Sequence, residues 1–172
     1  MNLIRSNDFV IVSGLARAGT TSLMNDLSKV NEFVSLSYAN MPFLMCPNIW
    51  AKFYKPKNTQ LKERSHKDGI MIGLNSNEAL EEYFFKVKTN DSFIQENYLA
   101  EHEIPEEDYL DYLDYQSIIK LDNQKLYLAK NNNFMLRYKS VRNYNDDFVM
   151  VVLFRDPLTH AASLREKPRE IL

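Results

Sequence analysis

The stretch "DFVIVSGLARAGTT" (Asp8–Thr21) decides the fold. Asp8–Ser13 is a β-branched and aromatic run, which predicts a buried strand. From Thr20 onward the apolar residues follow the three-and-four spacing of a helix, at Leu23, Met24, Leu27 and Val30. Gly14 and Gly19 lie between the two patterns. The stretch therefore predicts a strand, a glycine-containing loop and a helix.

The two glycines have the spacing of a phosphate-binding loop, G-x-x-x-x-G-K-[ST], whose lysine reaches the outer phosphates. Here Thr20 stands at the lysine position, and the nearest positive charge is Arg17, inside the loop. Glycines let backbone N–H groups approach an anion closely, and the hydroxyls of Thr20 and Thr21 add donors. The alternative is a plain turn in which Thr20 or Thr21 caps the helix.

Strand and helix patterns alternate along the rest of the chain. Further strands are expected at Phe33–Ser37, Lys125–Ala129 and Asp147–Phe154. Helical patterns cover Asn77–Lys88, with Asn77 as the cap, then Ile104–Lys120, Phe134–Val141 and a short piece within Pro42–Tyr54. Residues 55–77 read as an irregular surface excursion. This alternation predicts an α/β fold with a central parallel sheet and helices on both faces.

Composition limits the classes of function. The chain has 172 residues, of which 45% are apolar, and this is most simply one domain, residues 1–172. A net charge of −2 argues against a nucleic-acid-coating protein, and the single cysteine, Cys46, excludes an intrachain disulfide and a cysteine-based zinc site. No apolar run is long enough for a membrane span and no signal peptide is apparent, so we expect a cytoplasmic protein.

Basic residues follow three of the expected strands: Arg17, Lys130 and Arg155. Ligands of parallel sheets bind beyond the carboxyl ends of the strands, so one anion is expected to meet all three. In "RDPLTHAAS", Arg155 and Ser163 are both expected to face a phosphate. The alternative is structural: Asp156 caps the last helix, Pro157 suits its first turn and Arg155 pairs with a surface acid.

Together these motifs resemble the sulfotransferase family. "ARAGTTSL" resembles the family's loop for the 5′ end of the donor 3′-phosphoadenosine 5′-phosphosulfate (PAPS), and "VVLFRDPLTHAASL" resembles its 3′-phosphate motif. "YANMPFLMCPNIW", "ERSHKDGI", "EALEEYFFK" and "LAKNNNFMLRY" resemble segments of a bacterial-type branch. The resemblance implies a three-layer α/β/α fold like that of P-loop nucleotide triphosphatases.

The resemblance also implies an activity: transfer of a sulfuryl group from PAPS to a hydroxyl or amine of a small-molecule or glycan acceptor, without a metal. The implied donor-binding residues are Arg17, Ala18, Gly19, Thr20, Thr21, Ser22, Arg155 and Ser163. Family members commonly continue beyond the position of Leu172 with a basic segment over the 3′-phosphate. By that comparison the chain is expected to lack the usual C-terminal segment.

The candidate catalytic residues are His66 and Lys130. His66, in the long loop beside Glu63 and Asp68, is the first choice for the base that takes the acceptor's proton. Lys130 would neutralise the leaving oxygen, and its alternative is a capping and surface role. His102 lies among acids that predict a solvated face, and His160 is expected near the 3′-phosphate without being the base.

Two competing functions stay open. One is a P-loop kinase or other nucleotide triphosphatase, with Asp156 as a Mg²⁺ ligand after the strand. It has to explain Thr20 in place of lysine and Arg155 at the strand end. The other is a non-catalytic nucleotide-binding domain.

Overall fold

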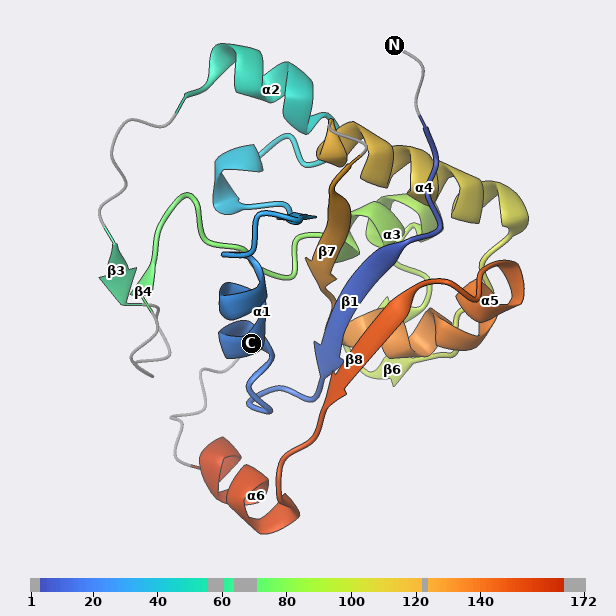
Figure 1. Cartoon of the computed structure of the whole chain (residues 1–172). Helices are drawn as coiled ribbons and strands as arrows, with labels where there is room; N and C mark the ends of the chain where they lie inside the picture. Colours follow the sequence, from blue (N-terminus) through green and yellow to red (C-terminus); the bar gives the residue numbers. More distant parts are fainter. Residues whose placement is uncertain (1–3, 56–60, 64–70, 122–123, 166–172) are drawn as a thin grey trace.

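The computed structural model describes residues 4–55, 61–63, 71–121 and 124–165, and its centre is a parallel sheet. The strands are β1 (Phe9–Gly14), β2 (Phe33–Val34), β7 (Leu126–Lys130) and β8 (Val149–Leu153). Their order is β2-β7-β1-β8, and every neighbouring pair is parallel. Helices flank this sheet (Figure 1). The predicted α/β class with a central parallel sheet is confirmed.

Alternate residues of β1 face two different apolar clusters. Phe9 and Ile11 belong to a large cluster with side chains from β7 and from the helices α3 (Glu82–Thr89), α4 (Glu106–Lys120) and α5 (Tyr138–Tyr144). Val12 belongs to a small cluster with Met24 of α1 (Thr20–Leu27). Since successive side chains of a strand point to opposite faces, α1 covers one face and the other three helices cover the opposite face (Figure 1).

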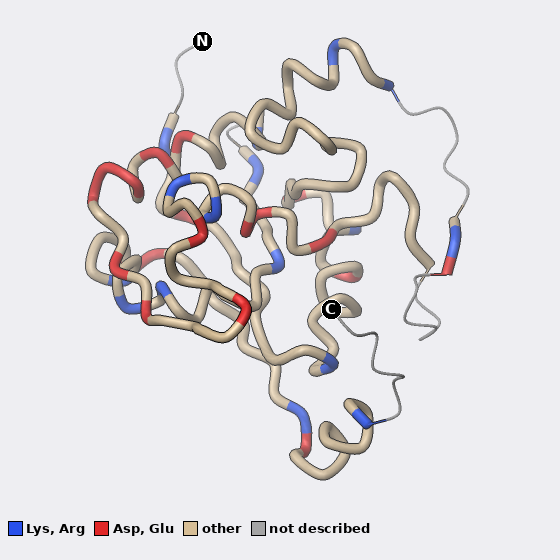
Figure 2. The backbone as a smooth tube through the Cα atoms, turned by 180° about the vertical axis from the view of Figure 1, so that it is seen from behind, with Lys and Arg blue, Asp and Glu red and all other residues tan. Residues whose placement is uncertain are grey.

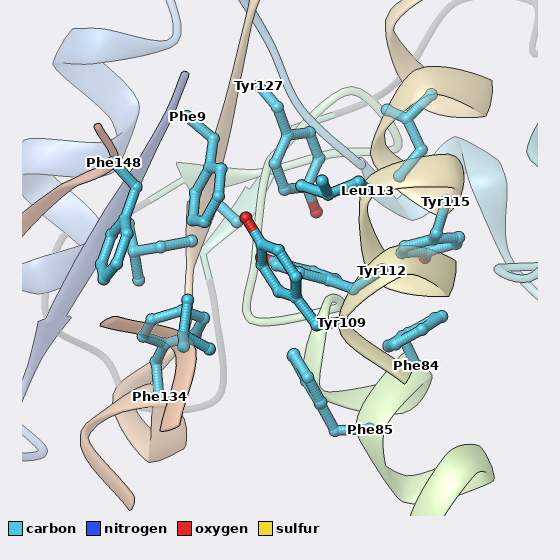
Figure 3. Close-up of a cluster of buried hydrophobic side chains, with 14 of the residues drawn as sticks. Phe9, Phe84, Phe85, Tyr109, Tyr112, Leu113, Tyr115, Tyr127, Phe134 and Phe148 are labelled. Carbon is cyan, nitrogen blue, oxygen red and sulfur yellow. The ribbon is translucent and has the colours of Figure 1, made fainter. Parts of the chain in front are cut away.

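The large cluster is built mainly from rings. Phe9 stacks on Phe148 with the ring centroids 5.0 Å apart, and its edge meets Tyr112 of α4 at 5.7 Å (Figure 3). Phe84 and Phe85 of α3 close the cluster from below α4. Edge-to-face and offset ring pairs add to the stabilisation from burial, so this face is the main core.

Helix α4 confirms the expectation for residues 104–120. Pro105 is its N-cap residue, Glu106, Glu107 and Asp108 occupy the first turn, and Lys120 the last. These charges complement the helix dipole.

Several boundaries differ from the expectations. The expected helix cap Asn77 is wrong, because α3 begins at Glu82, after Glu81, and has no side-chain cap. The strand expected at Phe33–Ser37 is only two residues long, and Phe134–Arg137 lies in a 3₁₀ helix, η2 (Asn132–Arg137), before α5. The remaining expected strands and helices are present within a few residues of the expected bounds, with α2 (Pro47–Phe53) as the short helical piece.

Small elements were not anticipated. They are the two-residue antiparallel pairs β3 (Lys62–Glu63) with β4 (Met71–Ile72) and β5 (Ile94–Gln95) with β6 (Tyr98–Leu99), and the 3₁₀ turn η1 (Tyr38–Asn40). Such short pieces carry no period that a sequence pattern could reveal.

Charge is unevenly distributed over the fold. Acidic residues gather around α3, α4 and the segment between them, whereas basic residues stand at the end of β8 and at the end of α6 (Pro157–Arg165) (Figure 2). At the end of β8, Arg155 is followed directly by the acidic Asp156, and α6 ends with Arg165.

Candidate functional site

The candidate site lies where β7, β1 and β8 end, because these three strands are neighbours and all point the same way. The loop after β1 leads into α1, Lys130 closes β7, and Arg155 follows β8. The three strands therefore end side by side, as expected (Figure 1), and the binding of one anion by all three basic residues stays a prediction.

The loop between β1 and α1 has an unusual backbone. Arg17 has φ 69° and Gly19 has φ 102°, both in the left-handed region. Left-handed geometry costs a non-glycine residue about 1–2 kcal/mol, and such residues cluster at functional sites. Gly14 has φ 153°, and a Cβ added there would lie 2.7 Å from the carbonyl oxygen of Leu153. Gly14 therefore allows β1 to approach the end of β8.

The first turn of α1 keeps donors available. Gly19 is its N-cap residue and no side chain caps the helix, so the alternative in which Thr20 or Thr21 is the cap is wrong. Among the described residues, no partner receives a hydrogen bond from the backbone N–H of Gly19, Thr20 or Ser22. Thr20 and Thr21 are buried and Ser22 is exposed. A helix N-terminus with open N–H groups favours an anion.

Ala18 stabilises the turn of the loop itself. Its N–H donates to the carbonyl oxygen of Leu15 at 3.1 Å, and the residue is half-buried.

The two phosphate motifs contact one another directly. The Nε of Arg17 donates to the Oγ of Ser163 at 3.1 Å, although the residues are 146 positions apart. Nη1 of Arg155 donates to the carbonyl oxygen of Arg17 at 3.3 Å. The side chain of Arg155 is exposed, and its guanidinium donates to this carbonyl rather than to the surface acid that the structural alternative expected. Two arginines and a serine thus stand together at one end of the sheet.

Lys130 is buried beneath the loop, so the alternative surface role is wrong. Its Nζ donates to Oγ1 of Thr21 at 2.7 Å and to Oε2 of Glu78 at 2.8 Å. A lysine can therefore reach the first turn of α1 from β7, although none follows Gly19 in the sequence.

The carboxylate of Asp156 caps the N-terminus of α6. Its Oδ1 accepts hydrogen bonds from the N–H and the hydroxyl of Thr159, both at 2.9 Å, and these bonds lower the pKa of the carboxyl. The structural alternative for Asp156 and Pro157 is confirmed. Within residues 4–55, 61–63, 71–121 and 124–165, no cluster of His, Cys, Asp and Glu is suited to hold a metal.

The three histidines differ in their position relative to the candidate site. His66 lies outside the described residues. His160 of α6 places Nε2 2.6 Å from the carbonyl oxygen of Ala16, at the loop. The acids on either side of His102 are exposed, as expected, but the His102 ring itself is buried, and its Nδ1 accepts from Nε of Arg137 at 3.2 Å. Burial, with the charge of Arg137, lowers the pKa of His102 to about 4.

Sequence reasoning missed a row of acids behind the site. Glu78 forms an ion pair with Lys130. The buried Glu81 accepts hydrogen bonds from the hydroxyl of Tyr112 and from Nδ2 of Asn131. Glu82 forms an ion pair with Arg137 through two hydrogen bonds of 2.7 and 2.8 Å. Burial raises the pKa of Glu81 to about 7, although the hydrogen bonds that its carboxylate accepts act in the opposite direction and lower the pKa.

Two adjacent acids, Glu81 and Glu82, within an apolar helical pattern were the available signal for this row. Their partners at 131 and 137 are too distant in sequence to be inferred.

No described helix combines the length and the apolar character that a membrane crossing requires. Comparisons of the chain with protein-family models, with curated proteins and with solved structures found no match.

Proposed function

We propose that this chain is a sulfotransferase of P-loop-like fold that binds PAPS and transfers its sulfuryl group to a hydroxyl or amine. The observation that carries the proposal is the contact between the two motifs. Arg17, from the loop after β1, donates to Ser163 of α6 at 3.1 Å. A donor with a sulfated 5′ end and a phosphate at its 3′ position has two anionic groups, and it would need both motifs at one site.

The residues at the loop suit a sulfate-bearing group. Donors and positive charge are supplied without a metal by the open N–H groups in the first turn of α1 and by the guanidinium of Arg17. Lys130, whose charge is paired with Glu78, adds an N–H donor beside Thr21. We assign the 5′ end to residues 17–22. Arg155 and Ser163 are assigned to the 3′-phosphate, for which a guanidinium fork and a hydroxyl are suitable partners.

In the proposed reaction, the acceptor oxygen or nitrogen forms a bond to sulfur while the bond from sulfur to the bridging phosphate oxygen breaks. The acceptor's proton passes to a base, and 3′-phosphoadenosine 5′-phosphate leaves. Lys130, which already donates to Thr21, is proposed to stabilise the charge on the leaving oxygen. The assignment of His66 as the base rests on the sequence alone.

The kinase alternative has less support. It requires the carboxylate of Asp156 to bind Mg²⁺, whereas this carboxylate accepts two hydrogen bonds from Thr159 and caps α6. It also requires a lysine directly after the second glycine, where Thr20 stands.

Thermal-shift titration tests the donor. We expect 3′-phosphoadenosine 5′-phosphate to raise Tm without a metal, and ATP with Mg²⁺ to have little effect. A ligand at one hundred times its Kd adds about 2.7 kcal/mol, roughly 5–10 °C for a chain of this size. The reverse response would refute the sulfotransferase proposal, and no response to either ligand would favour a non-catalytic domain.

Variants locate the binding. Arg155→Ala should weaken binding of the nucleotide at least tenfold, since a charged hydrogen bond is worth about 1.5–3 kcal/mol. Lys139→Ala is the matched control, because it removes one exposed positive charge that pairs with Glu101 far from the loop. Equal affinity of the two variants would remove Arg155 from the site. Sulfuryl transfer is then measured by mass spectrometry with PAPS and a panel of acceptors.

A further inference from the structure

Helix α6 is attached to the rest of the protein through one polar face. None of its side chains belongs to either apolar cluster, and Leu158 and Leu164 are exposed. Only His160 and Ser163 are less than exposed among residues 157–165. Residues three apart lie on the same side of a helix, so these two side chains define the side that meets the loop.

The bond made by His160 has a definite direction. A carbonyl oxygen only accepts, so Nε2 of His160 carries the proton and donates to Ala16 at 2.6 Å. The next carbonyl, that of Arg17, accepts from Arg155 at 3.3 Å. The guanidinium of Arg17 in turn donates a hydrogen bond to Oγ of Ser163 in α6 at 3.1 Å. Of these three contacts, the one from His160 is the shortest and uses neither of the two arginines.

We propose that His160 is a positioning residue: its ring fastens α6 to the loop at Ala16 and so fixes the separation between the loop and Ser163. This inference rests on the proposed function, in which the loop and the pair Arg155 and Ser163 hold two different anionic groups of one ligand. A ligand that carries both groups depends on the spacing between the two motifs. A ligand that carries only the 5′ group contacts the loop and does not depend on where α6 lies.

Binding of two different nucleotides distinguishes a positioning role of His160 from a general structural role. The dissociation constants of 3′-phosphoadenosine 5′-phosphate and of adenosine 5′-phosphate are measured by calorimetry for the full chain and its variants. His160→Ala should weaken the first nucleotide roughly three- to tenfold, the range expected for one hydrogen bond, and leave the second unchanged. His160→Gln should retain most of the affinity, because its amide can also donate to the carbonyl of Ala16.

Leu158→Ala is the control, since it changes an exposed side chain of the same helix. An unchanged ratio of the two dissociation constants in His160→Ala would overturn the proposal. Equal weakening of both nucleotides would overturn it too, because that result means general damage to the loop.

A measurement without a ligand keeps the inference testable if neither nucleotide binds. Amide hydrogen exchange of the free protein should become roughly three- to tenfold faster in α6 of His160→Ala, with β1 and β7 unchanged. Unchanged exchange in α6 would refute the fastening role of His160. A wild-type chain that binds neither nucleotide would instead refute the proposed function, so the two failures are distinguishable.

Discussion

Replacing Glu81 or His102 by glutamine should give the stability of the protein opposite dependences on pH. Both side chains are buried and both favour their neutral forms in the folded state. Burial raises the pKa of the Glu81 carboxyl from 4.5 to about 7, and burial with the charge of Arg137 lowers the pKa of His102 from 6.5 to about 4. Each shift corresponds to about 3 kcal/mol of folding free energy.

The signs follow from the protons bound in each state. For Glu81, the folded state holds a proton that the unfolded state has lost between pH 4.5 and 7, so its contribution to stability is lost as pH rises through this window. For His102, the unfolded state holds the extra proton between pH 4 and 6.5, so its contribution is lost as pH falls through this window. In the overlap the two contributions oppose one another.

The variants separate them. In Glu81→Gln the free energy of unfolding should fall on acidification from pH 6 to 5 by about 1 kcal/mol more than in wild type. In His102→Gln the free energy of unfolding should fall by about 1 kcal/mol less than in wild type. The slopes of the two variants should differ by about 2 kcal/mol per pH unit, and this difference is free of the contributions of other groups, which are the same in both variants. Urea denaturation followed by circular dichroism at the two pH values measures it.

The comparison uses slopes, so any constant loss of stability from either substitution does not affect it. Slopes that agree within about 0.5 kcal/mol per pH unit would show that these two groups do not titrate with shifted pKa values, and would refute the reasoning.

Three further substitutions test the contacts. Gly14→Ala should lower the free energy of unfolding by about 1–3 kcal/mol, measured by urea denaturation, and Gly19→Ala should lower it by less. The reason is that only at Gly14 would the new Cβ lie 2.7 Å from a backbone atom, so the opposite order would contradict this prediction. Glu82→Ala should cost about 3–5 kcal/mol, since it leaves the buried Arg137 unpaired, and a Tm within about 2 °C of wild type would count against it. Asp156→Ala should remove the cap of α6 at a local cost of about 1 kcal/mol, read as faster amide exchange in that helix, whereas Asp156→Asn should retain the cap.

The sheet was predictable because its strands are continuous apolar runs. Phe9–Gly14 and Val149–Leu153 consist mostly of β-branched and apolar residues, which is typical of strands in the middle of a parallel sheet. The two-residue strands at 62–63 and 71–72 have no such run, and their pairing depends on contacts that only the folded chain provides.

The candidate site was predictable in its location and less so in its contacts. The ends of parallel strands meet at one edge, so Arg17, Lys130 and Arg155 could be grouped from the sequence. The bond between Lys130 and Thr21 required the exact register of β7 beside β1. The direct bond from Arg17 to Ser163 was not foreseen either, since we expected a ligand to join the two motifs.

The buried polar residues were the hardest to predict. Glu81 lies within an apolar helical pattern and His102 lies among exposed acids. The burial of both depends on distant partners, Tyr112 and Asn131 for Glu81 and Arg137 for His102. Acids and histidines are ordinarily exposed unless hydrogen-bonding partners are present in the core. A local sequence pattern does not indicate a partner that is distant in the sequence.

The unequal size of the two apolar clusters has a consequence for how β1 is held in place. One face of the strand carries Phe9 and Ile11 into a cluster of many rings, whereas the other carries Val12 into a small cluster under α1. A slip of one residue along β7 or β8 would exchange the faces and bring the Phe9 ring against α1. The fully buried members of the cluster there are Val12, Met24 and Leu128, with partly buried side chains packed around them. The difference in volume between the two faces therefore excludes the shifted alignment, and the glycine loop always leaves the sheet at the same point.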